Sequence, residues 1–296
     1  MMNGKNILFA YLNGNYLVEI YNDGTKIRYL NYDHYQPLFP ESIDLKITNF
    51  CDNNCLMCHE ESSIYGTHAR LDHPFLSTLK KGTELALGGG NPFAHPQLKC
   101  FLERMNKQGI ICNITINQNH FVQYFSLINE LITEGLIYGI GISIINDNYL
   151  DEIMNFSKKY KHTVLHVIAG IITEKIIQKL SNQNVKLLVL GYKILGRGKD
   201  FYNSDIDNKI LYLKENILSI SKNFKLVSFD NLAIKQLDIK SQIKEEDYNN
   251  YYMGDDGQFT MYVDLVKEQF SVSSTTKVRY PLEDDICEMF KKIQNK

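Results

Sequence analysis

Three cysteines, Cys51, Cys55 and Cys58, lie within eight residues in a C-x3-C-x2-C arrangement. This spacing lets one loop close around a single metal centre. Three thiolates ligate three irons of a four-iron four-sulfur (4Fe–4S) cluster and leave the fourth iron without a protein ligand, whereas clusters that only transfer electrons usually have four cysteines. A vacant metal position is where a small molecule coordinates, as at a catalytic zinc. The sequence therefore predicts a metal centre that takes part in chemistry.

A zinc site is the alternative for the same segment. Its ligands would be the three cysteines and His59, and the protein would then be a zinc-stabilised binding module without catalysis. Cys58 and His59 are adjacent, so both side chains have difficulty reaching one ion.

The cysteine motif, which follows a predicted strand, resembles the hallmark of the radical S-adenosylmethionine (SAM) superfamily. The resemblance implies that SAM chelates the open iron and is cleaved reductively to a 5′-deoxyadenosyl radical, which abstracts hydrogen from a substrate. It also implies a flavodoxin- or ferredoxin-like electron donor. Met57 stands where the family usually has an aromatic residue, at a position whose backbone recognises the adenine. The substrate class stays open between a peptide, a nucleoside and another small molecule.

A glycine run, Gly88-Gly89-Gly90-Asn91, follows the next predicted strand. Glycines let the backbone approach a ligand closely. The run resembles the family's glycine-rich motif, whose backbone holds the amino group of SAM. That motif usually ends in Glu, and the carbonyl oxygen of Asn91 can also accept a hydrogen bond from an ammonium group. A tight turn is the alternative interpretation of the glycines.

Polar residues occur near the carboxyl ends of three later strands, where barrel enzymes build their active sites. By position, Asn117, Ser143 and His166 resemble the residues with which the family contacts the ribose and carboxylate of SAM. The alternatives are capping residues for Asn117 and Ser143. For His166, which lies in an apolar run, the alternative is a packed core histidine.

Two basic residues, Lys193 and Arg197, follow the sixth predicted strand and are candidates to bind a carboxylate or phosphate of the substrate. A solvated loop is the alternative for them, since Lys and Arg are mostly exposed. Residues 118–120 (Gln-Asn-His), after the third strand, are further candidates to face a substrate.

The elements that position these residues alternate strand with helix. Short β-rich apolar runs predict strands, and periodic patterns between them predict helices. The predicted strands are 43–48, 84–87, 110–117, 137–145, 163–168 and 185–190, and the predicted helices are 74–81, 96–107, 121–134, 148–159, 174–181 and 205–221. This rhythm requires a largely parallel sheet. An open doubly wound sheet shares it, and the cysteine motif favours a partial (β/α)6 barrel of the radical SAM type.

Three segments follow from this pattern. Residues 1–41 are predicted to form a β-meander and a linker, with turns at 13–15 and 22–24. Residues 42–229 form the predicted barrel. Residues 230–296 form an extension with a β-hairpin at 257–274 and an exposed loop at 245–256. The hairpin faintly resembles the framework of a cysteine-rich module in peptide-modifying relatives, with Ser273 and Ser274 where thiols would stand.

Composition narrows the class of protein further. The chain has 296 residues, 44% of them hydrophobic and 22% charged, enough apolar material for a sizeable core. A net charge of −2 argues against an extended nucleic-acid-binding surface. We find no secretory signal pattern and no run near the ~20 apolar residues of a membrane span, so we expect a cytoplasmic protein without a membrane partner.

Overall fold

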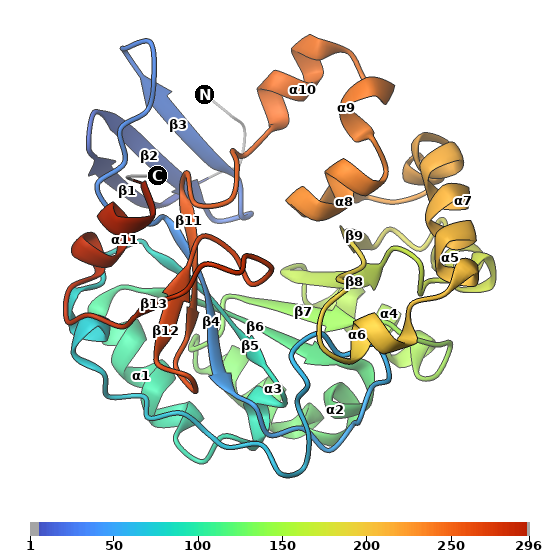
Figure 1. The fold of residues 1–296 in the computed structure, drawn as a ribbon, viewed down its shortest axis with the longest axis horizontal. Helices are drawn as coiled ribbons and strands as arrows, with labels where there is room; N and C mark the ends of the chain where they lie inside the picture. The colour runs from blue at the N-terminus through green and yellow to red at the C-terminus, as the bar shows by residue number, and fades with distance from the viewer. Residues whose placement is uncertain (1–5, 295–296) are drawn as a thin grey trace.

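The computed structural model describes residues 6–294, so residues 1–5 and 295–296 of the predicted first and last segments lie outside the described part of the chain. Two sheets are present (Figure 1). The smaller is antiparallel and runs in the order β1 (Ile7–Asn13), β2 (Tyr16–Tyr21) and β3 (Lys26–Leu30). Its turns fall at the predicted Asn-Gly and Asp-Gly positions, so the three-stranded meander is present as predicted.

The larger sheet has ten strands in the order β10-β9-β8-β7-β6-β5-β4-β11-β12-β13, parallel from β10 to β11 and antiparallel beyond. Their bounds are β4 Ser42–Thr48, β5 Glu84–Gly89, β6 Ile111–Asn117, β7 Gly139–Ser143, β8 Thr163–Ile168, β9 Lys186–Leu190, β10 Leu226–Phe229, β11 Thr260–Asp264, β12 Gln269–Ser271 and β13 Tyr280–Pro281. Among the described strands β10 and β13 are the two ends of the sheet and do not pair with each other. The fold is therefore mixed α/β around one large, mostly parallel sheet.

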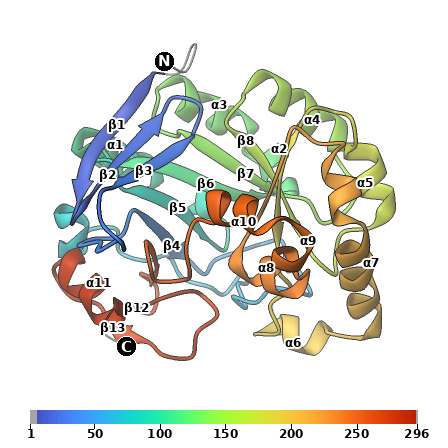
Figure 2. The ribbon, with the colours of Figure 1, turned by 90° about the horizontal axis from the view of Figure 1, so that it is seen from above.

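Helices connect and flank the strands of this sheet. Their bounds are α1 Leu98–Gln108, α2 Gln118–Gln123, α3 Phe125–Thr133, α4 Leu150–Lys159, α5 Glu174–Leu180, α6 Arg197–Phe201, α7 Ser204–Ser221, α8 Asn231–Gln236, α9 Ile239–Gln242, α10 Glu245–Tyr251 and α11 Ile286–Gln294. In Figure 2, α1, α3, α4 and α5 form an outer arc around the strands. Their apolar sides, such as Leu102 and Ile153, pack with the buried strand residues Leu45 and Ile114. The main core lies between this arc and the sheet.

The other face of the sheet, which we call the polar face, carries hydrophilic side chains. In β4, Asp44 and Lys46 alternate with buried isoleucine and leucine, and in β6 Asn113 and Thr115 do the same. A cavity of about 490 Å3 lies against this face, lined by residues of strands β5 to β10 and by the turn between β2 and β3 (residues 23–25). Parallel sheets are usually apolar on both faces. A polar, hollowed face therefore marks the side of the sheet on which a ligand can bind.

All six predicted strands occur, with ends that differ by at most two residues, and β8 matches its prediction at both ends. The predicted helix 121–134 is divided at Tyr124 into α2 and α3, and only Pro74–Thr78 of the predicted helix 74–81 is helical, as a 3-10 turn. A seventh strand, β10, pairs parallel with β9 and was not predicted. The predicted loop at 245–256 is wrong in part, because α10 forms there.

The predicted hairpin is present as β11 and β12, and it is part of the large sheet rather than an appendage. β11 pairs parallel with β4 over five residues, from Thr260 opposite Ser42 to Asp264 opposite Lys46. The segment predicted as a C-terminal extension thus borders the strand that leads into the cysteine motif.

A buried ion pair fastens the meander to the large sheet. The Arg28 guanidinium contacts both carboxylate oxygens of Glu41, at 2.8 and 3.0 Å, and stacks over the Phe259 ring at 3.8 Å. The Tyr16 hydroxyl donates to the same carboxylate at 2.8 Å. Within residues 6–294, no helix has the length and apolar character needed to cross a membrane.

Candidate cofactor site

The three cysteines lie in the loop that follows β4. The loop is held to the segment after it, since the Cys51 N–H donates to the Ser63 carbonyl at 2.9 Å. All three side chains are half-buried. Burial raises the pKa of the Cys55 thiol, and the nearby Cys51 and Cys58 thiols raise it further, so the three sulfurs are close enough to interact. Because a metal binds the thiolate, a metal that bound these cysteines would displace their protons.

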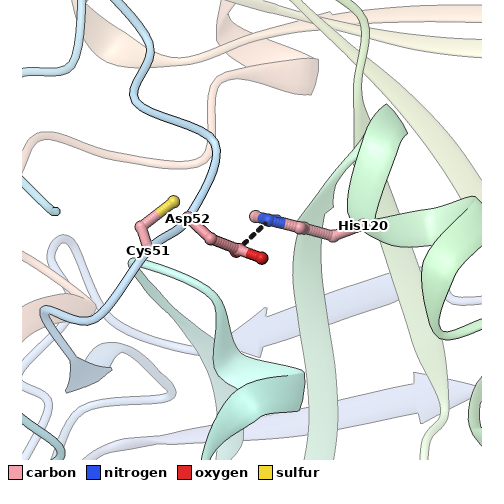
Figure 3. Close-up of side chains that lie close together, drawn as sticks. All are labelled: Cys51, Asp52 and His120. Atoms are coloured by element: carbon pink, nitrogen blue, oxygen red, sulfur yellow. Dashed lines mark hydrogen bonds and ion pairs between the residues drawn. The ribbon is translucent and has the colours of Figure 1, made fainter. Parts of the chain in front are cut away.

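The geometry does not match a site for one tetrahedral ion. Four ligands about 2.3 Å from a zinc ion would place their sulfurs only about 3.8 Å apart. The one set of at least three potential ligand atoms within 4.8 Å of one another in the described chain is Cys51, Asp52 and His120, and it omits the other two cysteines (Figure 3). The His59 ring instead lies 3.2 Å from the Lys193 ammonium. The three cysteines and His59 therefore do not form a compact set of ligand atoms in the described chain.

Two adjacent residues of the cysteine loop are tied to the start of α2. Asp52 Oδ1 lies 2.6 Å from His120 Nε2, and Asn53 Oδ1 accepts from Asn119 Nδ2 at 2.7 Å. Asn53 in turn donates through Nδ2 to the Cys55 sulfur at 3.1 Å. Sequence reasoning gave no role to Asp52 or Asn53. Their polar side chains, placed between two cysteines of the motif, were the feature of the sequence from which a role could have been predicted.

The glycine run packs directly against the cysteine loop. The Gly90 N–H donates to the Thr48 carbonyl at 2.8 Å, and the next N–H donates to the Phe50 carbonyl at 2.7 Å. A Cβ on Gly90 would lie 2.0 Å from the Phe50 oxygen, and one on Gly89 would lie 2.2 Å from the Thr48 oxygen. By contrast, a Cβ on Gly88 would meet no atom within 4 Å. Two glycines allow the close approach, and the third borders open space beside the cysteines.

Asn91 ends this run with an unpaired acceptor. Its side chain is fully buried, at 0% exposure, and Nδ2 donates to Asp52 Oδ1 at 3.4 Å. Oδ1 has no hydrogen-bond partner in the described chain. A buried carbonyl oxygen without a donor is costly. An ammonium group, such as the amino group of SAM, would satisfy it, so these residues fit the predicted cofactor.

The predicted polar residues of β6, β7 and β8 lie side by side across the polar face. Asn117 is paired in register with Ser143, and Ser143 with His166. The Asn117 side chain also caps α2 by accepting from the Asn119 N–H at 2.9 Å. The structure therefore brings the three together, and their contacts to SAM stay a prediction.

His166 is half-buried and lines the cavity of the polar face. Its ring lies over Gly141, where a Cβ would be 2.3 Å from the ring carbon Cε1. The imidazole ring has no hydrogen-bond partner among residues 6–294, whereas the backbone carbonyl of His166 accepts from the Ile144 N–H at 2.8 Å. Burial alone lowers the pKa of His166 to about 4, so the ring is neutral at pH 7. It is available there as a neutral donor or acceptor.

The loop between β9 and α6 covers the cysteine loop. Arg197 donates through Nε to the Cys55 carbonyl at 3.0 Å and through Nη2 to the Ser62 carbonyl at 2.9 Å. Lys193 donates to the Ser274 hydroxyl at 2.9 Å. Met57 is half-buried, and its carbonyl would lie 3.2 Å from a Cβ on Gly198. Arg197 is thus engaged with the loop backbone, and its predicted role in substrate binding, like that of Lys193, stays a prediction.

A network of charges that the sequence did not indicate links the cysteine loop to β11. The Lys46 ammonium, on a side chain only 2% exposed, lies 2.6 Å from the Glu60 carboxylate and 3.4 Å from the Asp264 carboxylate. The Tyr262 hydroxyl donates to Glu60 at 3.1 Å. Burial alone would raise the pKa of Glu60, but the neighbouring His59 and Lys46 hold it well below its usual value. The network holds the end of the cysteine loop against β4 and β11 on the polar face of the sheet.

No family model matches this sequence, and no curated protein matches it by sequence. Crystal structures of SuiB from Streptococcus suis have a similar fold. The structure bound to the precursor peptide SuiA has a TM-score of 0.64 at 11% identity, over 97% of this chain and 88% of that one. The structure bound to S-adenosylmethionine has a TM-score of 0.57 at 13% identity, over 86% of this chain. In that comparison the match spans 64% of the SuiB chain. The similarity to SuiB is therefore a similarity of fold.

Proposed function

We propose that this chain, which has the fold of SuiB, is a radical SAM enzyme that holds one 4Fe–4S cluster through Cys51, Cys55 and Cys58. The observation that carries the proposal is the packing of the glycine run, with its unpaired Asn91 acceptor, against the loop of three cysteines. The cluster and SAM, when bound, supply a 5′-deoxyadenosyl radical that takes a hydrogen atom from the substrate. SuiB, which is a radical SAM enzyme, supports the assignment through its fold.

In this scheme the residues of the chain bind SAM and orient it. Gly88 leaves room beside the cysteines, and Asn91 Oδ1 accepts from the amino group of SAM. Asn117, Ser143 and His166 line the polar face at the level where the ribose and carboxylate of SAM would lie. The loop from Gly191 to Gly198 covers the cysteine loop and helps to exclude water. A flavodoxin- or ferredoxin-like protein of the cytoplasm is the proposed electron donor.

Anaerobic reconstitution tests the proposal. Wild-type protein supplied with iron and sulfide should turn brown, with a broad band near 400 nm, and should convert SAM to 5′-deoxyadenosine under a low-potential reductant. Cys55→Ala should lose both properties, and Cys100→Ala is the matched control, because Cys100 is an exposed cysteine of α1. A colourless protein that binds one zinc ion would support the binding-module alternative instead.

We propose a peptide as the substrate. One of the similar SuiB structures is bound to its precursor peptide SuiA, and it has the TM-score of 0.64. The cavity of about 490 Å3 on the polar face has room for an amino-acid side chain. Perdeuterated proteolytic peptides should transfer deuterium to 5′-deoxyadenosine. Transfer from perdeuterated nucleosides but not from peptides would exclude this substrate class.

A further inference from the structure

The side-chain amide of Asn53 is aimed at one ligand sulfur. Its Nδ2 atom lies 3.1 Å from the Cys55 sulfur, and its Oδ1 atom accepts from Asn119 Nδ2 at 2.7 Å. Asn53 and Asn119 are both half-buried and are 66 positions apart in the chain. The hydrogen bond from Asn119 holds the Oδ1 end of Asn53 away from the sulfur, which leaves the N–H end facing it.

A donor at this position acts on the electronic state of the metal centre. Hydrogen bonds to ligand sulfurs are among the features that set the reduction potential of an iron–sulfur cluster. A reduced cluster carries more negative charge than an oxidised one, so a donated N–H stabilises the reduced state more. The bond from Asn119 polarises the Asn53 amide and strengthens its bond to the sulfur.

We propose that Asn119 and Asn53 form a two-step relay that raises the reduction potential of the cluster, making it easier for an electron donor to reduce. This inference rests on the proposed function. The relay acts through Cys55. Near the Cys51 sulfur the neighbouring groups are instead the backbone N–H groups of Asn53 and Asn54, which remain when a side chain is replaced. Side-chain substitutions therefore isolate the effect on Cys55.

Midpoint potentials of the reconstituted cluster, from titrations followed by electron paramagnetic resonance, test the relay. Asn53→Ala should move the potential to a more negative value, and Asn119→Ala should move it less in the same direction. The double variant should match Asn53→Ala, because Asn119 acts only through Asn53. Asn155→Ala, on the exposed side of α4, should match the wild type.

The outcomes separate the two proposals. A wild-type protein that takes up no iron overturns the proposed function and this inference with it. A wild-type cluster whose potential is the same in both single variants overturns the relay alone. Additive shifts in the double variant also overturn it. If Asn53→Ala does not hold a cluster, Asn119→Ala decides the question, since it leaves every residue of the cysteine loop in place.

Discussion

The Nε2 atom of His120 lies 2.6 Å from Oδ1 of Asp52, the residue directly after the first cysteine of the motif (Figure 3). His120 is in the first turn of α2, on an almost fully buried side chain, whereas Asp52 is 40% exposed. A rigid helix thus holds the cysteine loop at the point where the loop leaves β4. Side chains in a loop that is anchored to a helix lose little conformational freedom when a cofactor binds to them.

Removing this contact should loosen the loop. Asp52→Ala should increase amide hydrogen exchange in residues 51–58 about fivefold, since a partly exposed charged hydrogen bond is worth about 1 kcal/mol. Asp205→Ala, which breaks the exposed Lys209–Asp205 pair of α7, is the control and should leave that exchange unchanged. Unchanged exchange in Asp52→Ala would mean that the contact does not hold the loop.

Two glycine substitutions should differ in their effect on stability. Gly90→Ala places a methyl group 2.0 Å from the Phe50 carbonyl oxygen and should cost about 1–3 kcal/mol of unfolding free energy. Gly88→Ala meets no atom within 4 Å and should leave stability unchanged while weakening SAM binding, because its methyl group occupies the open space. Denaturant unfolding and SAM titration measure the two effects. Equal stability of the two variants would contradict this account.

Acid should destabilise the fold partly through His166. Burial lowers the folded-state pKa of His166 to about 4, while the unfolded chain has the ordinary value of about 6.5. The unfolded state therefore binds a proton first, and stability that is complete above pH 6.5 falls as the pH drops toward 4. At pH 5 the loss from this residue should be up to about 2 kcal/mol.

His166→Leu should remove this part of the pH dependence. The difference in unfolding free energy between pH 7.5 and pH 5.0 should be smaller in the variant than in the wild type. Identical pH dependence in both proteins would show that His166 takes up its proton at the ordinary pKa.

The Arg28–Glu41 pair should be essential for attaching the meander. Arg28→Ala leaves the Glu41 carboxylate, 1% exposed, with the Lys26 ammonium at 3.4 Å as its remaining cation. The loss should be about 3 kcal/mol, the lower end for a broken buried pair, because the charge keeps one partner. Arg70→Ala removes an exposed pair with Asp72 and should change stability by less than about 0.5 kcal/mol. Denaturant unfolding measures the loss of unfolding free energy in both variants. Similar losses would show that the buried Arg28–Glu41 pair does not hold the meander in place.

The local sequence pattern predicted the positions of most strands and helices. It did not predict which distant strands pair with each other, as β11 does with β4. Thr163 to Ile168 is a short β-branched run between polar segments, so its strand ends were predictable. The pairing of β11 with β4 joins residues more than 200 positions apart and leaves no local signal. The break between α2 and α3 at Tyr124 likewise follows no glycine or proline.

In the candidate site too, some features follow from the local sequence and others depend on tertiary contacts. The spacing of Cys51, Cys55 and Cys58 is enough to predict a ligand set, and their role as metal ligands stays a prediction. Arg197 was expected to face a substrate, yet its guanidinium donates to two loop carbonyls, a choice that depends on how the β9–α6 loop folds back. Residue type indicates which chemistry a side chain offers, and only tertiary contacts decide what it bonds to.

The position of β11 also bears on how the protein is made. Ribosomes release a chain from its N-terminus, so β4 emerges more than 200 residues before Thr260, the first residue that pairs with it. Until then, β4 has one row of unpaired backbone groups, the kind of edge that promotes aggregation. A nascent or truncated chain that stops before Thr260 would present this edge next to the cysteine loop, so that loop reaches its final surroundings only after β11 has been made.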